Sequence, residues 1–226
     1  MHLASLTIEN YVKTIYQICG RQGNGPAATG QLAAALGVSP GTVTSMLKTL
    51  KESGLAEYTP YEGVKLTTSG RKLALRVLRR HRLIEVFLAT TLQLSWDEVH
   101  EEAENMEHAV SDFLVNRIDE YLGYPSTDPH GDPIPKDDGT VSSPASRSLT
   151  DWEIGSRFRL VRVLDQSPQF LRYLSEAGLP LGAQGKVVAN NPDAGIVTIN
   201  VAGNETTLAR DVAGKILVAS LAESST

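Results

Sequence analysis

Residues 31–51 read QLAAALGVSPGTVTSMLKTLK, and this stretch decides the fold of the first part of the chain. Gly37 follows an apolar segment at the kind of position where helices end, and Ser39-Pro40 offers a capping hydroxyl followed by a proline suited to a first helical turn. The pattern predicts a helix over 28–36, a sharp turn and a helix over 40–53. A helix-turn-helix of this kind places its second helix in the major groove of DNA.

The flanking residues complete a winged helix-turn-helix. An apolar stripe from Ile8 to Ile18 predicts a preceding helix, which RQGNGP at 21–26 ends. After Gly54, residues 55–58 and 64–67 have the composition of two short strands joined by a turn. We therefore expect a DNA-binding domain whose hairpin forms the wing.

The second helix of this motif carries small and hydroxylated side chains on its exposed side. Such residues let a helix sit deep in the groove, while lysines contact phosphates. A helix-turn-helix used only for packing remains the alternative. The residues expected to contact double-stranded DNA are Ser39, Gly41, Thr42, Thr44, Ser45 and Lys48, with Tyr61 and Lys65 on the wing.

The net charge of -5 conceals three regions of different character. Residues 1–82 hold 11 Lys/Arg and 4 Asp/Glu, residues 83–140 hold 2 and 14, and residues 141–226 hold 8 of each. A basic first region suits phosphates, and an acidic middle region suits either a cation site or a solvated helical face. The single cysteine, Cys19, excludes a site built from paired thiolates. With neither a membrane-length apolar run nor a secretory signal, we expect a cytoplasmic protein with no membrane partner.

The rest of the chain predicts a helical region, a linker and a small β-barrel. Helical patterns cover 68–91, a segment capped by Ser95, and about 108–122. Residues 124–145 are rich in Pro, Gly, Asp and Ser, as linkers are. Beyond them, strand patterns at 157–164, 185–189, 195–201 and 205–208 surround one short helix at 170–177.

The acidic helical region contains a possible metal site. His100, Glu104, Glu107 and His108 are spaced so that one helix would carry all four on one face, and His81 and Glu85 repeat the i, i+4 spacing. Imidazole and carboxylate groups without thiolate favour the harder ions Mn²⁺ or Fe²⁺. A solvated acidic face is the alternative interpretation of the same pattern.

Several motifs together resemble the diphtheria toxin repressor family. They are TIENYVKTIY at 7–16, SPGTVTSMLKTL at 39–50, HRLIEVFL at 81–88 and HEEAENMEH at 100–108, while FLRYLSEAGLPLG at 170–182 is similar to the SH3-like domain of longer members, which is related to ferrous-transport accessory proteins. The resemblance implies a mainly α fold with a small β module: a winged helix-turn-helix at 1–70, a helical metal-binding and dimerisation domain at 71–123, a linker at 124–147 and an SH3-like barrel at 148–222. It also implies a homodimer that represses metal-uptake genes from a palindromic operator when it binds a divalent metal.

The resemblance carries ligands over residue by residue. A primary site would use Asn10, Glu104, Glu107 and His108, and Glu104 in place of a cysteine points to the manganese-sensing branch, so that Mn(II) is the expected cofactor. Two patterns exist for a second site. One would use His81, Glu85 and His100, and the other Glu85, Asp128, His130 and Asp165. Lys13 stands where some two-metal members have a second carboxylate, which argues against a close binuclear centre.

The alternatives belong to different classes of protein. An Fe(II)-responsive regulator of the same family would share the fold and most ligands. A di-metal carboxylate enzyme would need a Glu-x-x-His pair on two helices, but Asn105 stands three residues before His108. A winged-helix sensor of an organic ligand would not respond to chelators. We therefore expect a regulator rather than an enzyme.

Overall fold

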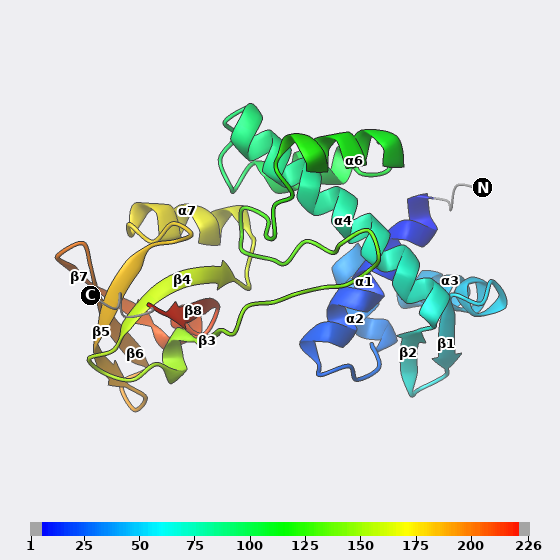
Figure 1. The fold of residues 1–226 in the computed structure, drawn as a ribbon. Helices are drawn as coiled ribbons and strands as arrows, with labels where there is room; N and C mark the ends of the chain where they lie inside the picture. The colour runs from blue at the N-terminus through cyan, green and yellow to red at the C-terminus, as the bar shows by residue number, and fades with distance from the viewer. Residues whose placement is uncertain (1–5, 222–226) are drawn as a thin grey trace. The chain divides into compact units, whose positions relative to one another are not determined.

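The computed structural model describes residues 6–221 of the chain, which form two compact units (Figure 1). Of the described residues, the first unit comprises 6–81, 107–112 and 135–141. The second comprises 82–106, 113–134 and 142–221. Each unit is described separately below.

The first unit contains the winged helix-turn-helix. Its elements are α1 (Leu6–Arg21), α2 (Thr29–Leu36), α3 (Pro40–Glu52) and the antiparallel strands β1 (Ala56–Thr59) and β2 (Gly63–Leu66). Gly37 has a φ of 65°, the left-handed conformation that ends α2, and the Ser39 hydroxyl accepts a hydrogen bond from the backbone N–H of Thr42. Both signals in the sequence are confirmed. Leu32, Val43, Leu47 and Leu50 are fully buried, which seats α3 on the core and leaves its opposite side exposed.

Three further helices follow the wing. They are α4 (Thr68–Thr91), α5 (Val99–Met106) and α6 (Asp112–Tyr121). The α4 helix contributes to both units, with the change at His81 and Arg82. Glu98 accepts hydrogen bonds from the backbone N–H and the hydroxyl of Ser95, which is one half of the expected capping box, but residues 96–98 form a turn and α5 begins only at Val99.

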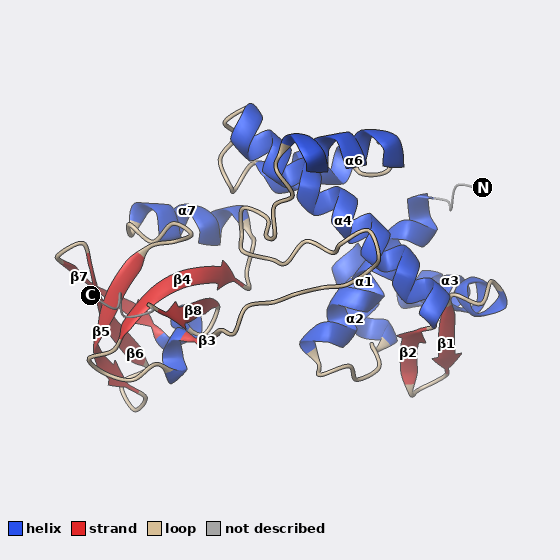
Figure 2. Cartoon of the chain, in the orientation of Figure 1, coloured by secondary structure: helices blue, strands red, loops and turns tan. Residues whose placement is uncertain are grey.

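The second unit includes an SH3-like β module, which confirms the expected fold class (Figure 2). Its six strands pair antiparallel in the order β3-β8-β4-β5-β6-β7, and the module also holds a short 3-10 turn, η1, and two helices. The bounds are β3 (Arg147–Ser148), η1 (Leu149–Asp151), β4 (Arg157–Val163), α7 (Pro168–Glu176), β5 (Gln184–Asn191), β6 (Ile196–Val201), β7 (Asn204–Ala209), α8 (Arg210–Ala213) and β8 (Ile216–Ser220). Phe170, Leu171 and Leu174 of α7 pack into the core of the sheet.

The segment predicted as a linker contains a buried turn. Asp128, His130 and Gly131 are inaccessible to solvent or nearly so, within the second unit. Gly131 has a φ of 87°, and a Cβ there would lie 2.0 Å from the carbonyl oxygen of Val161 in β4. This close approach lets the turn pack directly on the barrel. Among the residues that the structure describes, no helix is long and apolar enough to cross a membrane.

Candidate metal centre and DNA-binding surface

Glu107 is the centre of a group of polar side chains in the first unit, here named the first cluster: Glu9, Asn10, Lys13, His81, Glu107 and His108. The Glu107 carboxylate is fully buried, with Lys13 Nζ 2.6 Å from Oε1 and His81 Nδ1 2.6 Å from Oε2. Burial disfavours its charged form, but the hydrogen bond from His81 and the positive charge of Lys13 outweigh burial, so the pKa of Glu107 lies below its ordinary value. The buried carboxylate of Glu107 is therefore stabilised in its ionised form.

The imidazole of His108 joins Glu107 to α1. Its Nε2 lies 2.7 Å from Asn10 Oδ1 and 3.2 Å from Glu107 Oε1, while its Nδ1 lies 2.7 Å from Glu9 Oε2. An amide oxygen, an imidazole nitrogen and a carboxylate oxygen thus converge from segments almost 100 residues apart. The structure brings together three of the four residues expected in the primary site.

The expectation that one helix carries His100, Glu104, Glu107 and His108 on one face is wrong. The α5 helix ends at Met106, and Glu107 and His108 lie in the turn that follows it. Their side chains contact α1 and His81 within the first unit, whereas Glu104 belongs to the second unit. The spacing along the sequence could not predict this, because it does not show where the helix ends.

The second cluster lies in the second unit and consists of Glu85, Asp128 and His130, whose ligand atoms lie within 4.8 Å of one another. His130 Nδ1 is 3.9 Å from Glu85 Oε1 and 3.8 Å from Asp128 Oδ1. His130 Nε2 lies 2.7 Å from the backbone oxygen of Trp96, and because a carbonyl only accepts hydrogen bonds, Nε2 carries the hydrogen. Nδ1 therefore presents its lone pair to the two carboxylates, and it is buried with no hydrogen-bond partner. That is the state of a preorganised metal ligand.

Burial dominates the electrostatics of the second cluster. It raises the pKa of Asp128 well above the ordinary value, and the neighbouring Glu85 carboxylate raises it further. Burial also lowers the pKa of His130, which favours its neutral, metal-binding form. Arg82 offsets part of the negative charge, with Nε 3.5 Å from Asp128 Oδ2 and Nη2 3.0 Å from Asp132 Oδ2.

The remaining expected ligands have other surroundings. His100 Nδ1 lies 3.2 Å from Glu85 Oε1, and its Nε2 lies 3.9 Å from Glu104. Asp165 pairs with Lys215 at 2.9 Å and accepts a hydrogen bond from the backbone N–H of Ser167, and it is not among the converging ligand atoms of the second cluster.

Both clusters suit a divalent cation bound through nitrogen and oxygen. The first offers a carboxylate, an imidazole and an amide oxygen at 2.7 to 3.2 Å, and the second offers two carboxylates and a buried imidazole nitrogen that lacks a hydrogen-bond partner. Neither contains a thiolate, since burial raises the pKa of the Cys19 thiol and this residue lies in neither cluster. Such donor sets favour the harder divalent metals.

The recognition surface of α3 and the wing is open to solvent. Ser39, Gly41, Thr42, Ser45 and Lys48 are exposed, Thr44 is half-buried, and Lys65 is exposed on β2. The Thr44 hydroxyl donates to the carbonyl of Pro40 at 2.9 Å. Tyr61 is fully exposed at the tip of the wing, with a φ of 70°. All the expected DNA-contacting residues thus lie on the helix-turn-helix and its wing.

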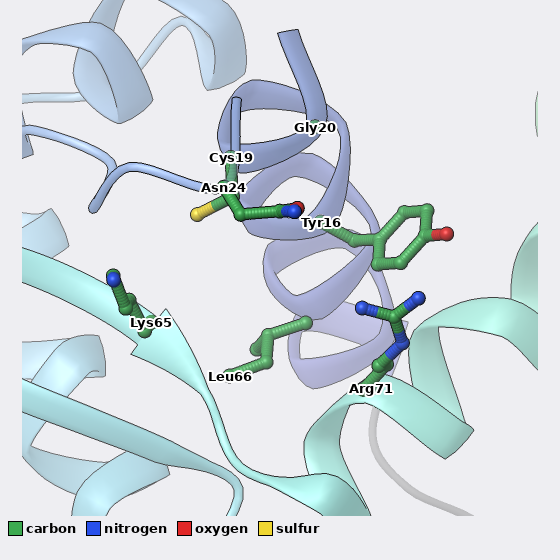
Figure 3. A pocket seen from close by; sticks show the side chains of 7 residues that line it. All are labelled: Tyr16, Cys19, Gly20, Asn24, Lys65, Leu66 and Arg71. Carbon is green, nitrogen blue, oxygen red and sulfur yellow. The ribbon is translucent and has the colours of Figure 1, made fainter. Parts of the chain in front are cut away.

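A pocket of about 200 Å³ lies between α1, β2 and the start of α4 (Figure 3). Two cations line it, Lys65 and Arg71, and the guanidinium of Arg71 lies 5.4 Å from the centre of the Tyr16 ring. No carboxylate lines the pocket, so it extends the basic surface of the wing rather than the metal-binding groups.

The α6 helix exposes large apolar side chains. Phe113 is 77% exposed and Tyr121 is 71% exposed, while Ile118 is buried within the unit. Tyr121 also packs edge-to-face against Phe87 of α4, with ring centres 6.3 Å apart. Exposed aromatic residues of this kind are typical of a protein interface.

Comparison with known proteins identifies the family. The model "Iron dependent repressor, N-terminal DNA binding domain" matches residues 4–64, and "Iron dependent repressor, metal binding and dimerisation domain" matches 67–136. The iron-dependent repressor IdeR of Mycobacterium leprae is 31% identical over 225 residues, covering 94% of this chain and 96% of that protein. This chain belongs to the iron-dependent repressor family. A FeoA domain also matches residues 147–220, in agreement with the SH3-like module.

Solved structures of this repressor family support the same assignment. A manganese-dependent transcriptional repressor in complex with manganese is 40% identical with a TM-score of 0.85, and the match covers 95% of this chain and 100% of that one. The structure of ScaR with bound Zn²⁺ is 33% identical with a TM-score of 0.80, covering 95% of this chain and 99% of that one.

Membership establishes the general activity of the chain. It is a metal-dependent, DNA-binding transcriptional regulator that acts as a homodimer, and it is not an enzyme, as the sequence predicted. Four polar partners in the clusters were not foreseen as such: Glu9 and Lys13 in the first, and Arg82 and Asp132 in the second. Glu9 adjoins Asn10 and Arg82 adjoins His81, and this adjacency was the available signal.

Proposed function

We propose that this chain is a Mn(II)-activated repressor of metal-uptake genes, which acts in the cytoplasm as a homodimer on a palindromic operator. The observation that carries the proposal is the convergence of Asn10, Glu107 and His108, an all-nitrogen-and-oxygen donor set built around an ionised, buried carboxylate. Most divalent metals bind a given site in the same order of affinity, so a protein selects its metal through ligand type and geometry. This set lacks the soft sulfur ligands that favour Fe–S clusters or copper.

The proposed primary site consists of Asn10, Glu104, Glu107 and His108, and Glu104 enters it on the family resemblance alone. A bound divalent ion would supply a concentrated positive charge. Asn10 would bind from α1, and Glu107 would exchange its contact with Lys13 for the ion. Glu9 contacts Nδ1 of His108 and so orients the ring, which leaves Nε2 as the nitrogen that lies beside the ligand atoms of Asn10 and Glu107. The α1 helix packs in the same core as α3, and its restraint would therefore bias the orientation of the recognition helix.

The proposed second site uses Glu85, Asp128 and His130, which the buried lone pair of His130 supports. Asp165 would complete this set if it left Lys215. The alternative set of His81, Glu85 and His100 stays open, because the contact of His81 Nδ1 with Glu107 orients the ring and does not exclude His81 as a ligand.

The proposed DNA contacts are the exposed residues of α3 and the wing. Ser39, Gly41, Thr42, Thr44 and Ser45 would lie in the major groove, and Lys48, Tyr61 and Lys65 would contact the backbone. Because α3 contains no arginine, bidentate contacts to guanine would not dominate the sequence readout.

An Fe(II)-activated regulator is the second candidate, and the relatives named iron-dependent repressors favour it. Harder oxygen ligands do not separate Mn²⁺ from Fe²⁺ by themselves. The two candidates differ only in the physiological effector.

The test is a selection of genomic DNA fragments by the full chain with Mn²⁺, with Fe²⁺ under anaerobic conditions, or with chelator. We expect fragments carrying an inverted repeat to be enriched with Mn²⁺ and lost with chelator. The Glu107→Ala and His108→Ala variants should enrich nothing. Because Glu107→Ala takes the carboxylate partner from the buried Lys13 ammonium, thermal unfolding of both variants is measured to show that each remains a folded dimer. Enrichment at a lower concentration of Fe²⁺ than of Mn²⁺ supports the second candidate, and equal enrichment with chelator contradicts both.

A further inference from the structure

Trp96 lies where the second cluster meets the barrel. This residue belongs to the turn between α4 and α5, and it packs against the hydrophobic core of the SH3-like module. All of the residues considered in this section belong to the second unit.

Two contacts join Trp96 to His130. The backbone oxygen of Trp96 accepts a hydrogen bond from His130 Nε2 at 2.7 Å, and the two rings are stacked at 12° with their centres 6.4 Å apart. His130 has no solvent exposure. Trp96 thus fixes both the tautomer and the plane of the ring, and with them the direction in which Nδ1 faces Glu85 and Asp128.

A third contact joins Trp96 to the barrel. Its indole Nε1 donates to Ser175 Oγ at 2.9 Å, and the Ser175 hydroxyl in turn donates to the carbonyl of Leu171 within α7. Asp97, the next residue, lies 3.3 Å from Arg172 of the same helix. The turn therefore contacts α7 through the side chains of both Trp96 and Asp97.

The turn that carries His130 and Gly131 also contacts β4. The backbone oxygen of His130 accepts from Val163 N–H at 3.0 Å, and Gly131 packs against Val161. The barrel therefore contacts the surroundings of His130 from two sides, although no side chain of the barrel is among the converging ligand atoms.

We propose that Trp96 is a positioning residue, which orients His130 for a divalent cation and transmits occupancy of the second cluster to α7 of the SH3-like module. The inference rests on the proposed second site. A cation held by Glu85, Asp128 and His130 restrains the His130 ring, and the stacked Trp96 and its hydrogen bond to Ser175 extend that restraint to the helix. The barrel would then be more rigidly docked when the cation is bound.

Calorimetry with Mn²⁺ tests the positioning role, using a Glu107→Ala background to remove the first site. Trp96→Ala should weaken the remaining binding event by about 10-fold to 100-fold, as loss of groups that orient a ligand does. Trp96→Phe should restore most of the affinity because it keeps a ring stacked on His130, and since both variants keep the backbone carbonyl, the difference between them reports the ring alone. A Trp152→Phe variant is the control, since Trp152 lies in the barrel core, where its indole donates to the carbonyl of Arg157 and its ring lies under the Arg147 guanidinium.

Hydrogen exchange of residues 168–176 tests the transmission. In the Glu107→Ala background Mn²⁺ should increase amide protection of α7, and Trp96→Ala should abolish that increase. A merely structural tryptophan would lower protection equally with and without the metal, and that result overturns the proposal, as does an unchanged affinity in Trp96→Ala. If the background protein shows no Mn²⁺ binding that His130→Ala removes, the second site itself fails, which is a separate outcome.

Discussion

Replacing Lys13 with methionine removes the ammonium group that lies 2.6 Å from the fully buried carboxylate of Glu107. The Lys13 side chain is itself only 7% exposed, and methionine fills most of its volume without a charge. If Glu107 is a metal ligand as proposed, a metal ion would have to displace this ammonium from Oε1 of Glu107.

The size of the effect follows from the burial of this pair. Removing one partner of a buried ion pair lowers the free energy of unfolding by about 3 to 5 kcal/mol. Because Glu107 retains His81 and His108, we expect a loss at the lower end, about 3 kcal/mol. A bound metal ion would recover that energy. Because about 1.4 kcal/mol corresponds to a tenfold change in affinity, Lys13→Met should bind Mn²⁺ up to about 100-fold more tightly.

Calorimetric titration measures the affinity for Mn²⁺, and thermal unfolding with and without chelator measures the stability of the metal-bound and metal-free protein. The metal-free variant should unfold at a lower temperature than the parent, and Mn²⁺ should restore most of the difference. Lys51→Met is the matched control, since Lys51 belongs to the same unit but donates to the carbonyl of Tyr58 instead of a carboxylate. If Lys13→Met binds Mn²⁺ no more tightly than the parent, Lys13 does not compete with the metal and the argument is refuted.

Substitutions in the DNA-binding surface, the first cluster and the turn at Gly131 test three other parts of the account. Thr44→Ala should weaken binding to the selected operator but not to random DNA, whereas Lys48→Ala should weaken both and flatten the salt dependence; fluorescence anisotropy separates them, and equal losses for Thr44→Ala would contradict base readout. Asn10→Asp adds a charged oxygen 2.7 Å from His108 Nε2 and should tighten Mn²⁺ binding in calorimetry, but unchanged affinity in both this variant and Asn10→Ala would remove Asn10 from the ligand set. Gly131→Ala places a Cβ against the Val161 carbonyl at a positive φ and should destabilise the second unit by at least about 1 to 3 kcal/mol in denaturant unfolding, and a neutral effect would mean that the turn does not pack as described.

Local signals predicted the winged helix-turn-helix well. Gly37 and Ser39 act within a few residues of themselves, so the turn they specify does not depend on distant contacts. The strand β8 (Ile216–Ser220) was missed because residues 216–219, ILVA, form an uninterrupted apolar run. Such a run lacks the alternation of apolar and polar residues by which a half-buried strand is recognised.

The first cluster could be predicted only in part. Spacing along the chain indicated Glu107 and His108, but it placed them on a helix that ends before them. Their partners Glu9, Asn10 and Lys13 lie more than 90 residues away in the sequence, a range that no local pattern reports, and Asn10 was expected only from the family resemblance. A search for metal ligands also passes over cations, so the buried pair of Lys13 and Glu107, on which the predicted competition with a metal rests, became visible only from the geometry.

The central claim is that metal binding and DNA binding are coupled, and coupling between two ligands is reciprocal at equilibrium. The most direct measurement is therefore the affinity for Mn²⁺ in the presence and absence of a saturating selected operator fragment, compared with the affinity for that fragment in the presence and absence of Mn²⁺. Both affinities should increase by the same factor in the parent, and the factor should fall to one in His108→Ala. If DNA leaves the Mn²⁺ affinity of the parent unchanged, the metal does not act through the first cluster on the recognition helix, and the account is contradicted.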